Sequence, residues 1–236
     1  MQTLKFLGRG GAFFPQEGNT SAYFIEDKTM YLFDCGETVF ATLMENNKLL
    51  NLIKDNDVNS IEIYITHLHS DHVGSLSSLI YYCYYVLDIK PKLYYKADSI
   101  VGNLLEVMLK LQGHNEYQYV LLDEPAKGIE PIVCDHVDEM LCYHYLITTD
   151  DNKKIFYSGD CSVLGRGILN CLAEDNVDEI YLECSTRESG VHLTLREIEK
   201  YKNRFALKNI YLMHIDNLEL IEKAKEYNLK VVELDK

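Results

Sequence analysis

Four residues able to bind a metal ion lie within six positions of the sequence, directly after an apolar run. The segment YITHLHSDHVGS, residues 64–75, contains His67, His69, Asp71 and His72, and so three of the eight histidines of the chain. Imidazole rings and a carboxylate held this close gain most from binding a cation, because protonated rings would repel one another. Neutral imidazole with carboxylate suits Zn²⁺, and also Mn²⁺, Fe²⁺ or Ni²⁺. The spacing predicts a metal site.

Predicted strands and helices alternate along the chain, which indicates sheets packed centrally with helices outside. Apolar runs predict strands at TLKFLG, SAYFIE, TMYLFD, IEIYITH, IEPIVCDH, MLCYHYLITT, KKIFYSGD, DEIYLECS, NIYLMHID and KVVELD. Helices are predicted at Thr38–Lys54, Ser75–Leu87, Asp98–Leu111 (with Asp98 or Ser99 as N-cap), GRGILNCLAE, TLREIEKYKNRF and NLELIEKAKEY. Residues able to bind a metal ion or exchange a proton recur at predicted strand ends: Asp34, His67, His136, Asp160, Glu183 and His214. Such ends present functional groups on loops.

The composition predicts a single domain, residues 1–236, because the sequence shows no repeat, low-complexity tract or linker. The seven cysteines are scattered without a Cys-x-x-Cys pair, which favours reduced thiols over a disulfide framework. Neither a secretory signal nor an apolar stretch of about 18 residues is visible. A cytoplasmic protein without a membrane segment is therefore expected.

The charge balance disfavours a protein that tracks a long nucleic acid. Thirty-seven acidic and 23 basic side chains give a formal net charge of −14. Affinity for a long phosphate backbone comes mainly from lysine and arginine. Bound divalent ions would reverse the field locally, so a small phosphate ester remains compatible with this composition.

Five motifs occur in an order that resembles the metallo-β-lactamase-fold hydrolases, in their ribonuclease Z-like phosphodiesterase branch. They are YLFDCGE, THLHSDHVGS, IVCDHVDEMLCYHYLI, FYSGDCS and IYLMHID. Taken alone, His136, Asp160 and His214 would each be interpreted as hydrogen-bonded strand or turn residues. Their order beside the histidine cluster favours a role as ligands.

The resemblance implies an α/β fold, an αββα sandwich of two mixed sheets flanked by helices. It also implies two divalent metal ions, with Zn²⁺ preferred and Mn²⁺ as the alternative. One ion would be held by His67, His69 and His136, and the other by Asp71, His72 and His214. Asp160 would be shared, and Asp34 would support the histidine loop without touching a metal.

Two further segments resemble the catalytic motifs of this branch. In VHLTLREIEKY, His192 corresponds to a histidine outside the metal shell, and in YLECST, Glu183 corresponds to its glutamate partner. The predicted catalytic residues are Asp71, His192 and Glu183, with His192 as general acid. Leu182 replaces the first histidine of the family motif, which weakens the match to RNA-processing members. Surface pairing of Glu183 and a backbone contact of His192 are the structural alternatives.

The expected substrate is small. RNA-processing relatives carry a long arm that grips tRNA, whereas only 23 residues separate His136 from Asp160 here. The opening FLGRGGAFFPQEGNTSAYFI is similar to compact cyclic-nucleotide phosphodiesterases, which include phage and bacterial enzymes of the anti-Pycsar type. This similarity implies hydrolysis of a 3′,5′-cyclic mononucleotide to a nucleoside monophosphate, in a homodimer.

Several alternatives stay open at this point. The chain could be a tRNA 3′-endonuclease, a lactonase or thioesterase of the same fold, or a metal-binding scaffold without catalysis. The turn Gly8–Gly11 could bind phosphate through backbone amides or be an ordinary loop. The run IYYCYYVL could stack a base, form a dimer face or pack as a helix against a sheet.

Overall fold

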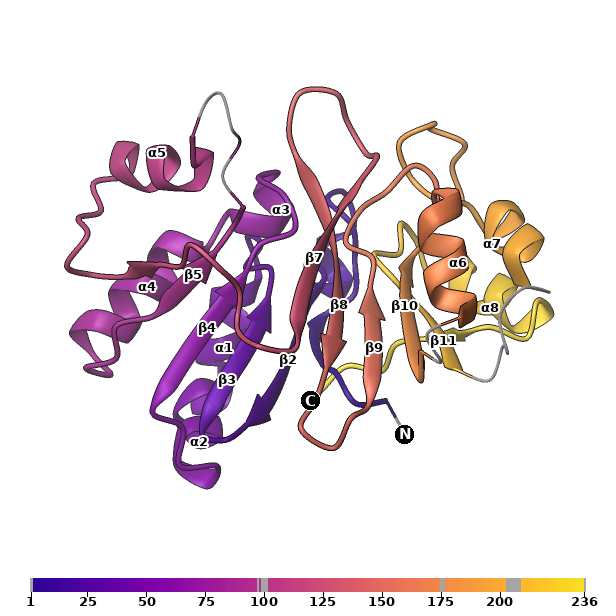
Figure 1. The fold of residues 1–236 in the computed structure, drawn as a ribbon. Coiled ribbons are helices and arrows are strands. Elements are labelled where there is room, and N and C mark those ends of the chain that lie inside the picture. Colours follow the sequence, from indigo (N-terminus) through magenta and orange to yellow (C-terminus); the bar gives the residue numbers. More distant parts are fainter. Residues whose placement is uncertain (1, 97, 99–101, 175–176, 203–208, 236) are drawn as a thin grey trace.

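The computed structural model describes residues 2–96, 98, 102–174, 177–202 and 209–235. Two mixed sheets form its centre, each with six strands in the described residues, in the orders β1-β2-β3-β4-β5-β6 and β12-β11-β10-β9-β8-β7. Helices flank both sheets, and the N- and C-terminal ends lie near each other (Figure 1). This arrangement confirms the predicted αββα sandwich.

Each sheet combines an antiparallel edge with a parallel part. The pairs β1/β2, β2/β3, β7/β8 and β8/β9 are antiparallel, and the other neighbouring pairs are parallel. The first sheet contains β1 (Lys5–Gly8), β2 (Ser21–Glu26), β3 (Thr29–Phe33), β4 (Ser60–Tyr64), β5 (Lys92–Tyr94) and β6 (Val120–Leu121). The second contains β7 (Ile129–Cys134), β8 (Cys142–Thr148), β9 (Lys154–Tyr157), β10 (Glu179–Glu183), β11 (Ile210–Met213) and β12 (Lys230–Val231).

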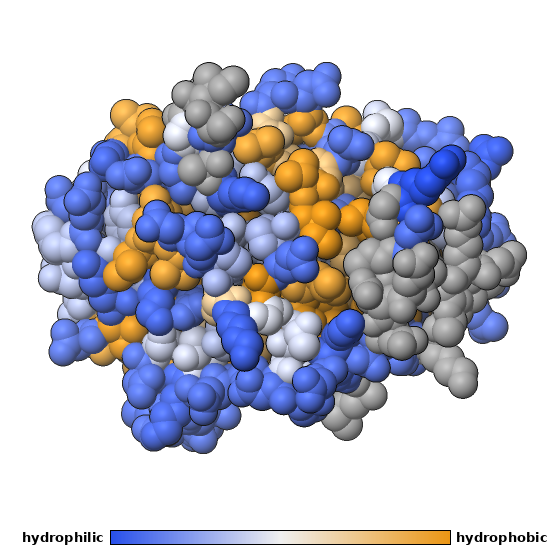
Figure 2. All heavy atoms as spheres, in the orientation of Figure 1, coloured by the Kyte–Doolittle hydropathy of each residue, from blue (hydrophilic) through white to orange (hydrophobic). Residues whose placement is uncertain are grey.

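The helices divide between the two sheets (Figure 1). The first half of the chain contributes α1 (Val39–Met44), α2 (Lys48–Asp55), α3 (Ser70–Val73), α4 (Leu76–Tyr85) and α5 (Leu104–Leu111). The second half contributes α6 (Arg166–Glu174), α7 (Leu195–Lys202) and α8 (Glu219–Glu226). Two short 3₁₀ turns are η1 (Pro15–Glu17) and η2 (Glu45–Asn47). Hydrophobic residues on the surface gather over α5 and along the strands in the middle of the face in Figure 2.

Two predicted helices have different bounds in the structure. The helix expected at Thr38–Lys54 is broken into α1 and α2, because Asn46 and Asn47 have left-handed φ values of 49° and 56°. Asparagine tolerates this conformation better than most residues. The helix expected from Asp98 starts at Leu104 instead, where the Asn103 side chain accepts a hydrogen bond from the Glu106 amide. Ser99 and residues 203–205 of the predicted TLREIEKYKNRF helix lie outside the described residues.

Aromatic rings join the two sheets directly beneath the strand ends. The ring of Phe33 on β3 lies with centroids 5.5 Å from each of Tyr64, Tyr145 and Tyr157. These residues come from both sheets and are fully buried. Offset and edge-on aromatic contacts stabilise a core beyond the burial of area alone. Aromatic side chains from both sheets therefore pack together at the centre of the sandwich.

Two of these buried tyrosines give a matched test of how the core is stabilised. The Tyr145 hydroxyl donates to the Ile65 carbonyl at 2.7 Å, whereas the buried Tyr157 hydroxyl has no hydrogen-bond partner among the described residues. We expect Tyr145→Phe to lower the free energy of unfolding by about 1 kcal/mol, because it leaves a buried carbonyl unpaired. Tyr157→Phe should be neutral or stabilising. Denaturant unfolding of both variants checks this, and an equal loss would contradict it.

Features expected from composition also have counterparts in the structure. The cysteines it describes are free thiols, in agreement with the expected lack of a disulfide framework. No helix formed by the described residues has the length and apolarity needed to cross a lipid bilayer.

Candidate metal centre

The candidate ligands lie where parallel strands end. His67 and His69 follow β4, Asp160 follows β9 and His214 follows β11. The carboxyl ends of parallel strands meet at one edge of a sheet, so side chains on the following loops converge there. Helix α3, which begins directly after His69, lies at this edge of the first sheet (Figure 1).

One group of ligand atoms is made of three imidazoles. His67, His69 and His136 each offer a ring nitrogen, and these nitrogens all lie within 4.8 Å of one another. His67 Nε2 and His69 Nδ1 are 2.9 Å apart. The rings of His67 and His136 lie edge to face, with centroids 5.0 Å apart. Three converging imidazoles with an adjacent carboxylate match the donor set that Zn²⁺ prefers.

A second group combines two carboxylates with two imidazoles. Asp71, His72, Asp160 and His214 also offer atoms within 4.8 Å of one another. His214 Nε2 lies 3.1 Å from Asp71 Oδ2, and His72 Nε2 lies 3.4 Å from the same oxygen. All four residues are buried. This group corresponds to the predicted ligands of the second ion.

Asp160 faces both groups at once. Its Oδ2 lies 3.8 Å from His136 Nε2 and 3.3 Å from His214 Nε2, and its Oδ1 lies 3.4 Å from His72 Nε2. A shared carboxylate of this kind could hold two ions close together. The structure thus brings the seven predicted ligands together in the predicted two groups, and a third, overlapping group joins Asp160 and His214 to Glu183 and His192.

Unpaired polar atoms indicate that these groups fit a cation. His72 Nε2, His136 Nε2 and Asp160 Oδ1 are buried and form no hydrogen bond among the described residues, although His72 Nε2 and Asp160 Oδ1 face each other as an ion pair at 3.4 Å. An unsatisfied buried polar atom costs about 1–3 kcal/mol, so three that converge need a common partner. Two of them are nitrogens and one is a carboxylate oxygen, which together suit a divalent metal.

Neighbouring groups hold the histidines in the form that binds metals. His72 Nδ1 lies 2.9 Å from Asp34 Oδ2, and His136 Nδ1 lies 2.8 Å from the Val191 carbonyl. A proton on each Nδ1 satisfies these acceptors and leaves the lone pair on Nε2, facing the cluster. Asp34 is itself held by the Thr66 amide at 2.8 Å. It therefore supports the histidine loop, as the sequence predicted.

The carboxylates concentrate negative charge at the centre. Burial alone would lower the pKa of His214, but the neighbouring carboxylates of Asp160 and Asp71 raise this pKa to about 9. Burial opposes ionisation of Asp160 as well, yet the His214 and His72 charges hold its pKa well below the usual value. Protonated imidazoles therefore balance the carboxylates in the protein alone. A divalent ion would supply the same positive charge and displace these protons.

Gly11 packs directly against the ring of His214. A β-carbon built on Gly11 would lie 3.0 Å from His214 Cε1 and 3.2 Å from its Nδ1. Contacts this short would force the imidazole to move by a few tenths of an ångström. Glycine, which has no β-carbon, therefore lets the backbone at position 11 lie close to the His214 ring.

We expect Gly11→Ala to weaken metal binding about tenfold, because displaced ligands and their supports typically cost this much. Gly165→Ala is the control, since nothing lies within 4 Å of a β-carbon there. Competition with a chromogenic chelator measures both affinities. Equal metal affinity in the two variants would contradict a role of Gly11 in seating His214.

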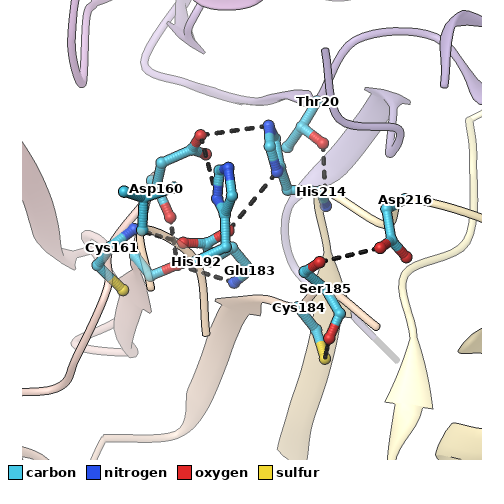
Figure 3. Close-up of polar contacts among 12 residues, drawn as sticks. Thr20, Asp160, Cys161, Glu183, Cys184, Ser185, His192, His214 and Asp216 are labelled. Atoms are coloured by element: carbon cyan, nitrogen blue, oxygen red, sulfur yellow. Dashed lines mark hydrogen bonds and ion pairs between the residues drawn. The ribbon is translucent and has the colours of Figure 1, made fainter. Parts of the chain in front are cut away.

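A glutamate–histidine pair lies beside the shared aspartate (Figure 3). His192 Nδ1 lies 2.7 Å from Glu183 Oε2 and 3.8 Å from Asp160 Oδ2. Glu183 is fully buried and its Oε1 accepts from the Cys161 amide at 2.5 Å. Burial and the Asp160 charge raise the pKa of Glu183 to about 7, while Glu183, against the effect of burial, raises the pKa of His192. The geometry thus supplies the predicted pairing rather than either structural alternative.

The centre opens into a cleft of about 570 Å³. Its lining includes His69, Asp71, His136, Asp160, His192 and His214. A larger cleft of about 920 Å³ lies near η1, α1 and α2, but no histidine is among its described lining residues. The smaller cleft is therefore the one that can bring a substrate to the metal ligands.

Comparison with known proteins places the chain in a family. A family model described as "Anti-Pycsar protein Apyc1" matches residues 2–235. The chain belongs to this family. The anti-Pycsar protein Apyc1 of Paenibacillus harenae is 24% identical over 246 residues, covering 98% of this chain and 96% of that protein. The predicted anti-Pycsar type is confirmed.

Solved structures share the architecture at low identity. The metallo-β-lactamase fold protein YhfI from Bacillus subtilis has a TM-score of 0.74 at 16% identity, covering 99% of this chain and 97% of that chain. The short form of human tRNase Z has a TM-score of 0.66 at 19% identity, covering 98% and 96%. They confirm the predicted metallo-β-lactamase fold. This Apyc1-family chain combines that fold with histidine and aspartate clusters that could hold metal ions.

The cleft of this Apyc1-family member contains an ordered turn that sequence reasoning missed. Asp216 Oδ2 accepts a hydrogen bond from Ser185 Oγ at 2.9 Å (Figure 3). It also accepts one from the Thr186 amide at 3.0 Å. Asp216 follows His214 by two positions, and Ser185 follows Glu183 by two. The turn therefore ties the strand end of Glu183 to that of His214. Only the proximity of these residues to predicted site residues could have indicated it.

The Gly8–Gly11 turn does not offer free amides for a phosphate. The Arg9, Gly10 and Gly11 amides donate to the carbonyls of Glu17, Gly18 and Ile215, at 3.0, 2.7 and 2.9 Å. The turn is an ordinary loop whose backbone is hydrogen-bonded to the end of η1 and to the segment that follows β11.

Proposed function

We propose that this chain hydrolyses 3′,5′-cyclic mononucleotides to nucleoside 5′-monophosphates. The observation that carries the proposal is the contact of His192 with buried Glu183 in the cleft that both ligand groups line. Membership of the anti-Pycsar family agrees with it, since the sequence resembles enzymes that destroy cyclic mononucleotide signals.

The seven clustered histidines and aspartates would hold the metal ions. When bound there, two divalent ions would supply Lewis acidity toward the phosphoryl oxygens and a water nucleophile at neutral pH. The protein side chains orient the ester and manage its protons. Asp34 and the Val191 carbonyl fix the ring orientations of His72 and His136, so these ligands need no rearrangement when substrate arrives.

His192 would protonate the leaving group. Because its Nδ1 donates to Glu183, its Nε2 is the nitrogen that can deliver a proton. As the oxygen of water bonds to phosphorus, the bond between phosphorus and the ribose 3′ oxygen breaks. That oxygen takes the proton of His192, so the product is the 5′-monophosphate. A proton released by the water restores His192, and Glu183 stabilises the charged ring throughout.

The dimensions and charge of the protein favour a small substrate. A cleft of about 570 Å³ falls within the range of small-molecule sites, about 300–1,000 Å³. The formal net charge of −14 disfavours a long nucleic acid. Both features argue against a tRNA 3′-endonuclease, which remains the alternative, together with lactone or thioester hydrolysis.

A panel of 3′,5′-cyclic nucleotides tests the proposal. The metal-loaded protein should release nucleoside 5′-monophosphates, and a chelator or His69→Ala should abolish the release. Release of 3′-monophosphates would overturn the assignment of the leaving oxygen. If no cyclic nucleotide is hydrolysed and the protein cleaves precursor tRNA or a lactone instead, that activity would replace the proposed function.

The open cleft counts against a purely structural metal site, because structural sites are closed by protein ligands. The homodimer, the single-domain organisation and the cytoplasmic location stay predictions. Zn²⁺ as the bound metal is likewise part of our proposal, with Mn²⁺ as the alternative.

A further inference from the structure

Phe13 is an exposed aromatic side chain on the lining of the metal-centre cleft. It is 90% exposed, and it lies in the same cleft as Asp160, His192 and His214. Its neighbour Phe14, in contrast, packs against the hydrophobic cluster of the second sheet. One of two adjacent phenylalanines is thus turned inward and the other is left on the surface of the cleft.

A tight turn presents Phe13 in this way. The Phe14 amide donates to the Gly11 carbonyl at 3.0 Å, which closes the turn around Ala12 and Phe13. Phe14 anchors one side of the turn in the core. The turn therefore places Phe13 at its tip, on the surface of the protein.

The same turn is fixed relative to the metal ligands. The Gly11 amide donates to the Ile215 carbonyl at 2.9 Å, and the Ile215 amide donates to the Arg9 carbonyl at 2.8 Å. Gly11 also contacts the His214 ring. Phe13 is only two residues from Gly11, so its backbone is held at a defined place beside the centre.

The apolar part of the cleft lining suits a flat, apolar group. Ala12, Val137 and Val191 line the cleft together with Phe13. A phenyl ring offers a π face and no hydrogen-bonding group, so it can stack on a base without reading its edge. A phosphate held at the metal ligands would leave the nucleoside to extend along the cleft.

We infer that Phe13 is the base-stacking residue of this cleft and provides affinity for the nucleoside part of the substrate. The inference rests on the proposed function for the identity of the ester, and it adds the residue that holds the base. Because every base has a π face, stacking on Phe13 gives affinity with little discrimination among bases.

Binding of product tests the inference without relying on turnover. Adenosine 5′-monophosphate and ribose 5-phosphate are titrated calorimetrically into the metal-loaded wild type, Phe13→Ala and Phe13→Tyr. We expect Phe13→Ala to weaken adenosine 5′-monophosphate binding about tenfold, as loss of one stacked base does, and Phe13→Tyr to stay within about twofold. Affinity for ribose 5-phosphate, which lacks a base, should be equal in all three. Leu111→Ala, at an 84% exposed residue of α5, is the control.

Other results would overturn either the stacking role of Phe13 or the proposed function. Equal weakening of both ligands, or no weakening of either, would overturn the stacking role. A change of oligomeric state on sedimentation of Phe13→Ala would also overturn it, since Phe13 would then belong to a subunit interface. Phe13-dependent binding of adenosine 5′-monophosphate without turnover of any cyclic nucleotide would leave the stacking role standing and remove the proposed function.

Discussion

Asp160→Asn is expected to abolish activity and to remove most of the bound metal. The carboxylate of Asp160 lies within 4.0 Å of nitrogens from His67, His72, His136 and His214. An amide keeps the shape of the side chain but loses the charge that a shared ligand of two cations needs. We expect hydrolysis to fall about a thousandfold or more, because both ligand groups lose the same residue.

The fall in activity should be matched by a fall in metal content. Metal analysis of the purified variant, reloaded with Zn²⁺ and Mn²⁺ in turn, measures the stoichiometry directly. Asp57→Asn is the control, because the Asp57 carboxylate is an exposed surface group paired with Lys28. Full metal content with near wild-type activity in Asp160→Asn would contradict its place between the two groups.

His192→Asn and Glu183→Gln are expected to lower kcat while leaving the metal content unchanged. His192 and Glu183 form their own hydrogen-bonded pair at 2.7 Å, and His192 is 25% exposed in the cleft. General acid catalysis typically contributes about 10²- to 10⁴-fold. We therefore expect losses of about a hundredfold or more on a cyclic nucleotide for His192→Asn. The loss should be smaller for Glu183→Gln, which retains the imidazole.

A substrate with a good leaving group separates proton donation from positioning. The p-nitrophenyl ester of thymidine 5′-monophosphate releases p-nitrophenolate, which needs no proton when it departs. The His192→Asn variant should cleave this ester at nearly the wild-type rate. A loss as large as that on the cyclic nucleotide would show that His192 holds the substrate instead of protonating its leaving group.

The local sequence was sufficient to predict site residues where residue type and spacing act together. His67, His69, Asp71 and His72 are neighbours in the chain, so their convergence requires only a strand end and one helical turn. His136 and His214 are far apart in sequence and came from the resemblance to a family. The Val191 carbonyl that holds His136 could not be predicted, because backbone acceptors carry no signature in the sequence.

Short strands and local turn geometry limited the prediction of the secondary structure. β5 and β6 were missed because they have only three and two residues, too few for a pattern of alternation. The predicted break-free helix at Thr38–Lys54 failed at two left-handed asparagines. The Tyr-rich run forms α4, with Leu79, Ile80 and Cys83 buried, so the expected packing of a helix against a sheet is what the structure contains.

His114 and His144 show why a histidine count alone is a weak guide. Both are buried, and neither belongs to the clusters found among the described residues. His144 Nδ1 lies 2.5 Å from the Ser158 carbonyl, and burial lowers its pKa to about 4. It is therefore a neutral core residue. Without the motifs, its sequence setting in a strand resembles that of His214.

We predict that residues between positions 67 and 214 assemble a centre for two metal ions. Anomalous diffraction from crystals of the metal-loaded protein, measured on either side of the metal absorption edge, tests it most directly. We predict two peaks, one among His67, His69 and His136, the other among Asp71, His72 and His214, with Asp160 between them. A single peak, or peaks outside these residues, would contradict the account.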